Sequence, residues 1–237
     1  MLRLRVKFKK YGPVRFIGHL DVMRFFQKVI RRAGIDVAYT GGFSPHQIMT
    51  FAAPLGVGIT SNGEYMDIEI HSITSCEDVR KRLNAASVPG IEIIFTGLLP
   101  DHAENAMASV AAASYTVRFR EGRAPSADLS AFIPDFLSRD HILYTKKTKK
   151  GERELDLKPG IYEFTCSDNG GCETPSFHIL ADASSAGNIK PIQIMEAFLA
   201  HCGEVLQENA LLITREEIYT RAESSRLISL EDMCCQS

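Results

Sequence analysis

Basic and ionisable side chains around the first expected helix have the chemistry of an anion site. Guanidinium groups donate forked hydrogen bonds to phosphate oxygens, and free backbone N–H groups at a helix start favour an anion. The same residues also fit a solvated helix face whose start is capped by Asp21. The predicted anion-binding residues of this region are Arg15, His19, Arg24, Lys28, Arg31 and Arg32.

A loop after this helix brings an aromatic ring, a hydroxyl group and a histidine into one short stretch: Phe43, Ser44 and His46. Phe43 can stack on a nucleic acid base, which contributes about 1–3 kcal/mol per base. His46 carries a proton that can move near neutral pH. The alternative is that Phe43 anchors the loop in the core while His46 is exposed to solvent.

Glycines in the same loop have the spacing G-x-G-x-x-x-x-G, which is not a P-loop because no Gly-Lys-Ser/Thr follows. We expect them to shape turns, and we expect Glu64 to accept backbone N–H groups or to pair with an arginine. The expected structural residues of the loop are Gly42, Gly56, Gly58, Gly63 and Glu64.

A lysine-rich strand–turn–strand lies in the second half of the chain, with Arg153 next to the lysines. Such a run is usually a solvated surface. Combined with the basic helix, it can also form a two-part groove for a nucleic acid backbone. The residues predicted to contact nucleic acid here are Lys146, Lys147 and Lys149.

The charge of the chain is unevenly distributed. Residues 1–50 hold ten basic and two acidic side chains, a net charge of +8, while the whole chain carries −2 and residues 51–237 therefore carry −10. Folding does not require this imbalance, but it would attract a polyanion. The chain contains no H-E-x-x-H, no serine nucleophile elbow and no Rossmann fingerprint. We expect neither a cofactor nor a metal.

The hydropathy of the chain favours a soluble cytoplasmic protein, in which reduced thiols are expected. None of the six cysteines forms a C-x-x-C pair, and no apolar run approaches the roughly 18 residues of a membrane span. Cys166 and Cys172 flank a turn and either face each other or are two ordinary strand residues. Cys234 and Cys235 are either part of an unstructured end or a metal or redox handle.

The elements expected to position these residues alternate between strands and helices. Residues 2–10 alternate with period two, residues 19–33 have one apolar face, and Gly34 follows as a helix stop. A strand at 35–40, the loop 41–63, a strand at 64–71, a helix to about 86 and a strand at 91–99 complete the series. The order matches the ferredoxin-like βαββαβ pattern.

A second cycle of the same kind begins after residues 100–113. Strands are expected at 115–120, 141–147, 152–157, 162–167, 174–181 and 211–214, with helices at 126–138 and 191–202. The predicted fold is α+β with two tandem ferredoxin-like halves, the second elaborated by extra antiparallel strands. Expected domains are 1–100 and 112–222, followed by a flexible tail at 223–237.

Several motifs resemble one bacterial family, the radical-SAM-linked proteins, a domain of unknown function. They are RFIGHLD at 15–21, GFSPH at 42–46, PLGVG at 54–58, SNGEYMDI at 61–68, KKGERELDL at 149–157 and ITRE at 213–216. The resemblance implies a separate chain or an extension of a cobalamin-binding radical-SAM enzyme, in an accessory role near RNA or ribosome modification. The chain lacks the C-x-x-x-C-x-x-C triplet that binds a radical-SAM cluster.

Three hypotheses about function remain open. The leading one is an accessory protein that partners a radical-SAM enzyme without catalysing the reaction. It would bind RNA or a ribosomal component, or present substrate, and no membrane partner is expected. The second is a metal-independent ribonuclease in which His19 or His46 acts as general acid or base. The third is a protein-interaction module whose basic helix docks on an acidic partner.

Overall fold

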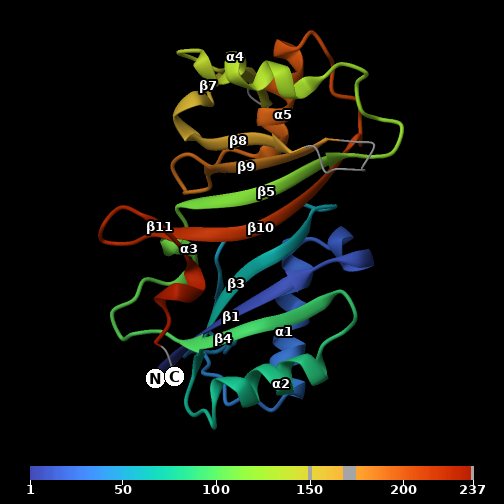
Figure 1. Ribbon diagram of the computed structural model, residues 1–237. Helices are drawn as coiled ribbons and strands as arrows, with labels where there is room; N and C mark the ends of the chain where they lie inside the picture. Colours follow the sequence, from blue (N-terminus) through green and yellow to red (C-terminus); the bar gives the residue numbers. More distant parts are fainter. Residues whose placement is uncertain (149–150, 168–174, 236–237) are drawn as a thin grey trace. The chain divides into compact units, whose positions relative to one another are not determined.

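The computed structural model describes residues 1–148, 151–167 and 175–235. It is a mixed α+β fold whose strands are mostly antiparallel, and it divides into two compact units (Figure 1). Unit 1 consists of Met1–Ala111 and Arg215–Ser237, and unit 2 is Ala112–Thr214. Among the described residues, every helix is too short or too polar to span a bilayer.

The sheet of unit 1 has the order β4-β1-β3, with β2 and part of β10 paired to the outer edge of β3. β1 pairs antiparallel with both β3 and β4, and β2 pairs antiparallel with β3. In the register of β1 and β3, Val6 lies opposite Met66. The strands are β1 (Leu2–Lys10), β2 (Met49–Phe51), β3 (Thr60–Ile70), β4 (Ile91–Leu98) and β10 (Leu211–Arg221).

Two helices cover one face of this sheet, α1 (His19–Arg32) and α2 (Cys76–Ala86). Period-two alternation in β1 directs Leu4, Val6 and Phe8 into the core that both helices share, where each is at most 1% exposed. The Ser75 hydroxyl accepts a hydrogen bond from Asp78 N and caps α2.

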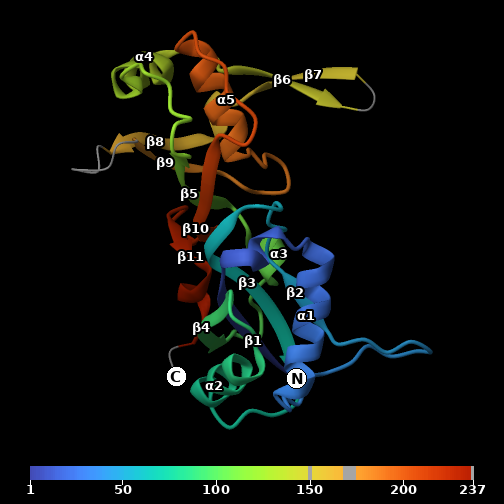
Figure 2. The same ribbon diagram turned by 90° about the vertical axis from the view of Figure 1, so that its right-hand side faces the viewer.

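The other face of β1 is covered by the C-terminal segment (Figure 2). This segment contains β11 (Leu227–Ser229), which pairs with β10, and the short 3₁₀ helix η4 (Leu230–Met233). The structure differs here from the expected flexible tail at 223–237, because Leu230 is fully buried. The expected second domain also ends earlier, since residues from Arg215 onward belong to unit 1.

Unit 2 has the strand order β5-β9-β8 and a separate hairpin, β6-β7. Its core holds clustered phenylalanines, among them Phe164, whose ring lies 4.9 Å from that of Phe198. The elements are β5 (Ala112–Phe119), η2 (Leu129–Phe132), α4 (Ile133–Ser138), β6 (Leu143–Thr148), β7 (Gly151–Asp156), η3 (Lys158–Gly160), β8 (Ile161–Ser167), β9 (Ser176–Asp182) and α5 (Pro191–His201).

Three sequence-based expectations are corrected. The strand expected at 35–40 is reduced to two isolated bridges, Val37 to Ile70 and Tyr39 to Gln47. The loop expected at 41–63 contains β2 and the first residues of β3, and the helix expected at 126–138 begins as a 3₁₀ turn at Leu129. Short elements of this kind lack the repeated period on which the expectations were based.

Candidate nucleic-acid interface

The exposed face of α1 carries a row of basic side chains. Its buried residues Val22, Phe26, Val29 and Ile30 fix how the helix sits on the sheet, so the residues between them face water. The row consists of Arg24, Lys28, Arg31 and Arg32, all exposed.

Little on the protein neutralises this row. Arg24 lies 3.5 Å from Asp21, and both side chains are more than 60% exposed, so this ion pair is weak. Arg32 donates to the Ala86 carbonyl at 2.9 Å. In the part of the chain that the structure describes, Lys28 and Arg31 make no ion pair. The row is therefore available to a polyanion.

The loop after α1 forms a hairpin, residues 39–47, that projects from unit 1 (Figure 2). Thr40 N donates to the His46 carbonyl at 2.9 Å, and His46 N donates to the Thr40 hydroxyl at 3.1 Å. At the tip, Gly42 has a φ of 98°, a left-handed conformation that favours glycine. Gln47 Nε2 donates to the Gln27 carbonyl at 3.3 Å and so ties the base of the hairpin to α1.

Phe43 at the tip of this hairpin is fully exposed, with a relative exposure of 109%. It therefore does not anchor the loop in the core, which was the alternative interpretation. Ser44 and His46 are also exposed, and the His46 Nδ1 lies within hydrogen-bond distance of the Thr40 hydroxyl and the Ser44 carbonyl. The hairpin presents an aromatic ring to solvent, and its base is bonded to the helix that carries the basic row.

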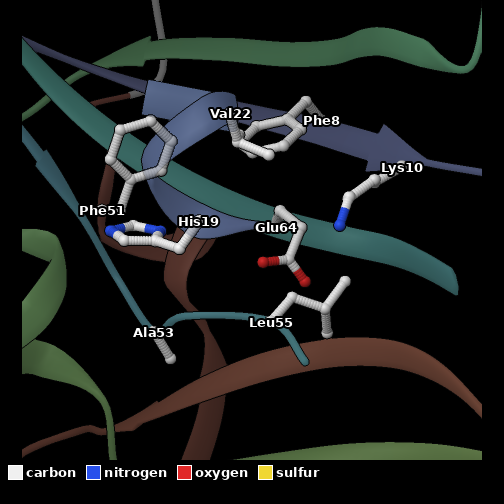
Figure 3. Close-up of a pocket in the computed structure, with 8 residues that line it drawn as sticks. All are labelled: Phe8, Lys10, His19, Val22, Phe51, Ala53, Leu55 and Glu64. Carbon is white, nitrogen blue, oxygen red and sulfur yellow. The ribbon is translucent and has the colours of Figure 1, made fainter. Parts of the chain in front are cut away.

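A small pocket lies between β1, the start of α1 and the loop before β3 (Figure 3). The His19 ring meets Phe51 edge-on, with ring centroids 5.3 Å apart. Glu64 is 5% exposed and accepts a hydrogen bond from Arg215 Nε at 2.7 Å and another from Arg215 Nη2. Arg215 Nη2 also donates to the Ala53 carbonyl at 3.0 Å. The Glu64 carboxylate is thus held by an internal ion pair.

Lys10 lines the same pocket and is 2% exposed. Its ammonium group donates to the Ile17 carbonyl at 2.9 Å and to the Arg15 carbonyl at 3.4 Å. Burial lowers the pKa of Lys10, and Glu64 opposes that shift. Gly58 N donates to the same Arg15 carbonyl at 2.8 Å, so Lys10 and Gly58 together fasten the segment before α1.

The predicted residues do not converge on one surface. His19 and Glu64 share the pocket, whereas His46 lies on the hairpin and the basic row lies on α1. The Arg15 guanidinium lies 4.7 Å from the Phe16 ring centroid. Lys146 is exposed on β6; the side chain of Lys147, and Lys149 with Lys150, lie outside the described residues.

The expected loop glycines have different roles. Gly56 and Gly58 belong to the loop before β3, and Gly58 has a φ of 86°. Gly63 instead lies within β3, where an added Cβ would come 2.7 Å from the Glu216 carbonyl oxygen. It is required for close approach of β3 and β10, not for a turn.

Sequence reasoning missed Lys10, Phe51 and Arg215. Lys10 had a signal: it continues the alternation of Leu4, Val6 and Phe8, which places a charge on the core face of β1. Pairing of Glu64 with an arginine was one of the two roles expected for it, but nothing in the sequence identified Arg215 as the partner, because the two residues lie 151 positions apart.

The cysteines do not form a metal site within the described ranges, where no three His, Cys, Asp or Glu side chains gather to hold an ion. Burial raises the pKa of Cys234 to about 12, which disfavours a reactive thiolate. Cys235 N donates to the Leu98 carbonyl at 2.8 Å. The segment with Cys234 and Cys235 is therefore attached to β4 and is not an unstructured end. Cys172 lies outside the described residues.

Comparisons with known proteins give a family and a distant structural match. The model of an uncharacterized protein conserved in bacteria (DUF2344) matches residues 3–191. No curated protein matches the chain. A chain of the crystal structure of a Cbf5-Nop10-Gar1 complex matches 97% of the residues with a TM-score of 0.48 and 9% identity. The match covers 53% of that chain, so this protein spans about half its length.

Proposed function

The chain belongs to DUF2344, a family of uncharacterized proteins conserved in bacteria, and on this premise we propose that it is an accessory protein that binds RNA without catalysis. The bound RNA would lie along the exposed face of α1, with a base stacked on Phe43. By its sequence resemblance, the partner of this accessory protein is a radical-SAM enzyme.

The observation that carries the proposal is the basic row of α1 together with an exposed aromatic side chain on a hairpin whose base is bonded to the same helix. Four exposed cations, of which only Arg24 forms an ion pair among the described residues, would each displace counterions from a phosphate backbone. A fully exposed phenylalanine offers its ring face to any base. This combination of a cationic track and a stacking platform is typical of proteins that bind single-stranded nucleic acid.

The two histidines favour binding over cleavage. A ribonuclease would need His19 or His46 to reach a phosphodiester and exchange a proton with it. His19 packs against Phe51 in the pocket, while His46 is bonded within the hairpin, and the pocket residues Glu64 and Lys10 are engaged in internal contacts.

We also infer that each unit is ferredoxin-like. In unit 1, the order β4-β1-β3-β2 with a helix in each crossover supports this. In unit 2, the strands lie in the order β5-β9-β8 within the sheet. Along the chain, β9 is followed by α5 and the first residues of β10, which supports the same pattern, with β6-β7 as an insertion.

Charge reversal on α1 tests the RNA proposal. Lys28→Glu combined with Arg31→Glu should weaken binding of single-stranded oligouridine about tenfold or more at low salt. It should also flatten the dependence of log affinity on log salt by about 0.7 for each phosphate that the variant no longer neutralises. Fluorescence anisotropy across a salt series measures both quantities.

The matched control places the same charge change on α2, with Arg80→Glu and Lys81→Glu. This control should retain the affinity of the unaltered protein. Equal affinities for the two double variants, or no saturable binding by the unaltered protein, would overturn the proposal.

The partner is tested by pull-down of a radical-SAM enzyme with and without RNase. Retention after RNase indicates direct protein contact, and loss indicates a bridge of RNA. Absence of the enzyme under both conditions would remove it as a partner and leave the RNA proposal to the anisotropy experiment.

A further inference from the structure

Unit 2 contains a groove of about 490 Å³ between the β6-β7 hairpin and the start of α5. Its remaining walls are the segment around η3 and the loop that joins β9 to α5. The volume is within the usual range of small-molecule sites, roughly 300–1,000 Å³. The charged residues that line it are Lys146, Arg153, Asp156, Asp182 and Lys190.

The three cations of the groove have no acidic partner in the part of the chain that the structure describes. Lys146 and Arg153 stand directly opposite each other across the hairpin. Like charges in that position repel and destabilise a strand pair. Lys190, at the start of α5, adds a third exposed positive charge to the same groove. An anion between them would remove this repulsion.

The two carboxylates of the groove already accept other hydrogen bonds. Asp156 accepts from Ile142 N at 3.0 Å and from Lys158 N at 3.0 Å, and it pairs with His141 at 2.8 Å.

Asp182 accepts from Ser184 N at 2.8 Å and from the Ser184 hydroxyl at 2.6 Å, and the Tyr162 hydroxyl donates to its other oxygen at 3.2 Å. Both acids therefore stabilise loops of unit 2, and neither forms an ion pair with a groove cation in the described ranges.

A buried amide supplies a neutral donor to the groove. Gln193 is 6% exposed, and its Oε1 accepts from Lys190 N at 2.8 Å. The hydrogen bonds among the described residues include none that its Nε2 donates. The positive end of α5 lies at the same place and favours negative charge.

We propose that this groove binds the phosphate of a nucleotide, with Lys146, Arg153 and Lys190 as its charged ligands and Gln193 Nε2 as a further donor. The volume admits a phosphate together with a sugar and a base. The nucleotide can be free or part of an RNA strand, since both carry the same group. The site is independent of the α1 surface in the proposed function.

Calorimetric titration of the full chain with ADP, and separately with inorganic phosphate, tests the site. Saturable binding of ADP is expected, and Arg153→Gln combined with Lys190→Gln should weaken it about tenfold or more. The matched control, Arg123→Gln with Arg139→Gln, removes two exposed charges elsewhere on unit 2 and should leave the affinity within about twofold.

Absence of ADP binding, or equal loss in the two double variants, would overturn the proposal. Competition between ADP and oligouridine, retained in the Lys28→Glu/Arg31→Glu variant, assigns the site to a nucleotide within RNA. Binding of ADP without competition assigns it to a free nucleotide. RNA binding by α1 and nucleotide binding by the groove are thus tested with different variants, so either proposal can fail without the other.

Discussion

The basic residues of β1 and those of α1 lie within thirty positions of each other in the sequence, yet their surroundings are opposite. Arg5 is fully buried and donates to both oxygens of Asp67 at 2.8 and 2.9 Å. Lys7 bonds Glu217 at 2.6 Å and Glu231 at 2.8 Å. Lys28 and Arg31 on α1 are exposed. Arg5 and Lys7 therefore contribute little to an external field, whereas Lys28 and Arg31 contribute fully.

The difference teaches that a charge count along the chain overestimates the charge available at the surface. A buried cation is tolerated only when an anion and hydrogen bonds surround it. The strand cations therefore define a structural network inside unit 1, whereas the helix cations need no partner because water solvates them. The net charge of +8 in residues 1–50 is partly cancelled by acids that lie far along the chain.

The largest effect that sharpens this comparison is expected from Arg5→Met. It leaves Asp67 buried without its partner, and it should reduce the free energy of unfolding by about 3–5 kcal/mol. Urea denaturation of the purified variant measures this loss. Arg24→Met, which removes an exposed cation, serves as the control and should change stability by less than about 1 kcal/mol. Similar losses in the two variants would break the comparison.

The next effect is expected from Gly63→Val, which would force β3 and β10 apart. The added Cβ meets the Glu216 carbonyl oxygen at 2.7 Å, next to the glutamate that pairs with Lys7. We expect a loss of about 1–3 kcal/mol in unfolding free energy. Gly122→Val, at a position with open space, gives a reference that carries only backbone strain. A smaller loss for Gly63→Val than for Gly122→Val would contradict the packing argument.

A smaller, pH-dependent effect is expected from Lys7. Burial lowers the pKa of Lys7, but hydrogen bonds and attraction from Glu217 and Glu231 exceed that effect, and the pKa lies above 10.5. Because the folded pKa exceeds the unfolded one, this stabilisation is complete below about pH 10.5 and is lost as pH rises through the folded pKa.

Urea midpoints measured across the alkaline range should therefore fall, and Lys7→Met should fall less steeply than the unaltered protein. Tyr65→Phe is measured in the same experiment, because Tyr65 also affects stability in the alkaline range. Burial first, and Glu217 next, raises the pKa of Tyr65 far above its usual 10. Equal alkaline slopes for Lys7→Met and the unaltered protein would exclude a contribution from Lys7.

The smallest effect on stability is expected from the helix cations. Lys28→Gln with Arg31→Gln should change the unfolding free energy by less than about 0.5 kcal/mol, since neither forms an ion pair among the described residues. Thermal denaturation of the double variant checks this. A loss above about 2 kcal/mol would mean that the row belongs to the structural network, and the contrast with β1 would disappear.

The exposed face of α1 could be predicted from the sequence, and the surroundings of β1 could not. The helical period of Val22, Phe26 and Val29 determines which side of α1 faces water. The period of β1 correctly separates Leu4 and Val6 from Arg5 and Lys7, but it does not reveal what covers the second face.

The partners of that second face are invisible to local patterns. Leu230 and Glu231 lie more than 220 positions from the β1 residues they contact, in a polar stretch that resembles a solvated end. The pocket has one predictable cation, Lys10, whereas Arg215, which pairs with the pocket residue Glu64, could not be predicted for the same reason. Long-range ion pairs leave no period in a single sequence.

The return of residues 215–233 to the N-terminal unit has a consequence for biosynthesis. During translation, the stretch 112–214 emerges with all of its own unit and can fold first, although it is encoded in the middle of the chain. Arg5 and Lys7 must wait for Leu230, Glu217 and Glu231 to leave the ribosomal exit tunnel. The nascent chain therefore completes β1 only after residues 215–233 have been made, and a polypeptide terminated before them would present that strand to chaperones and proteases.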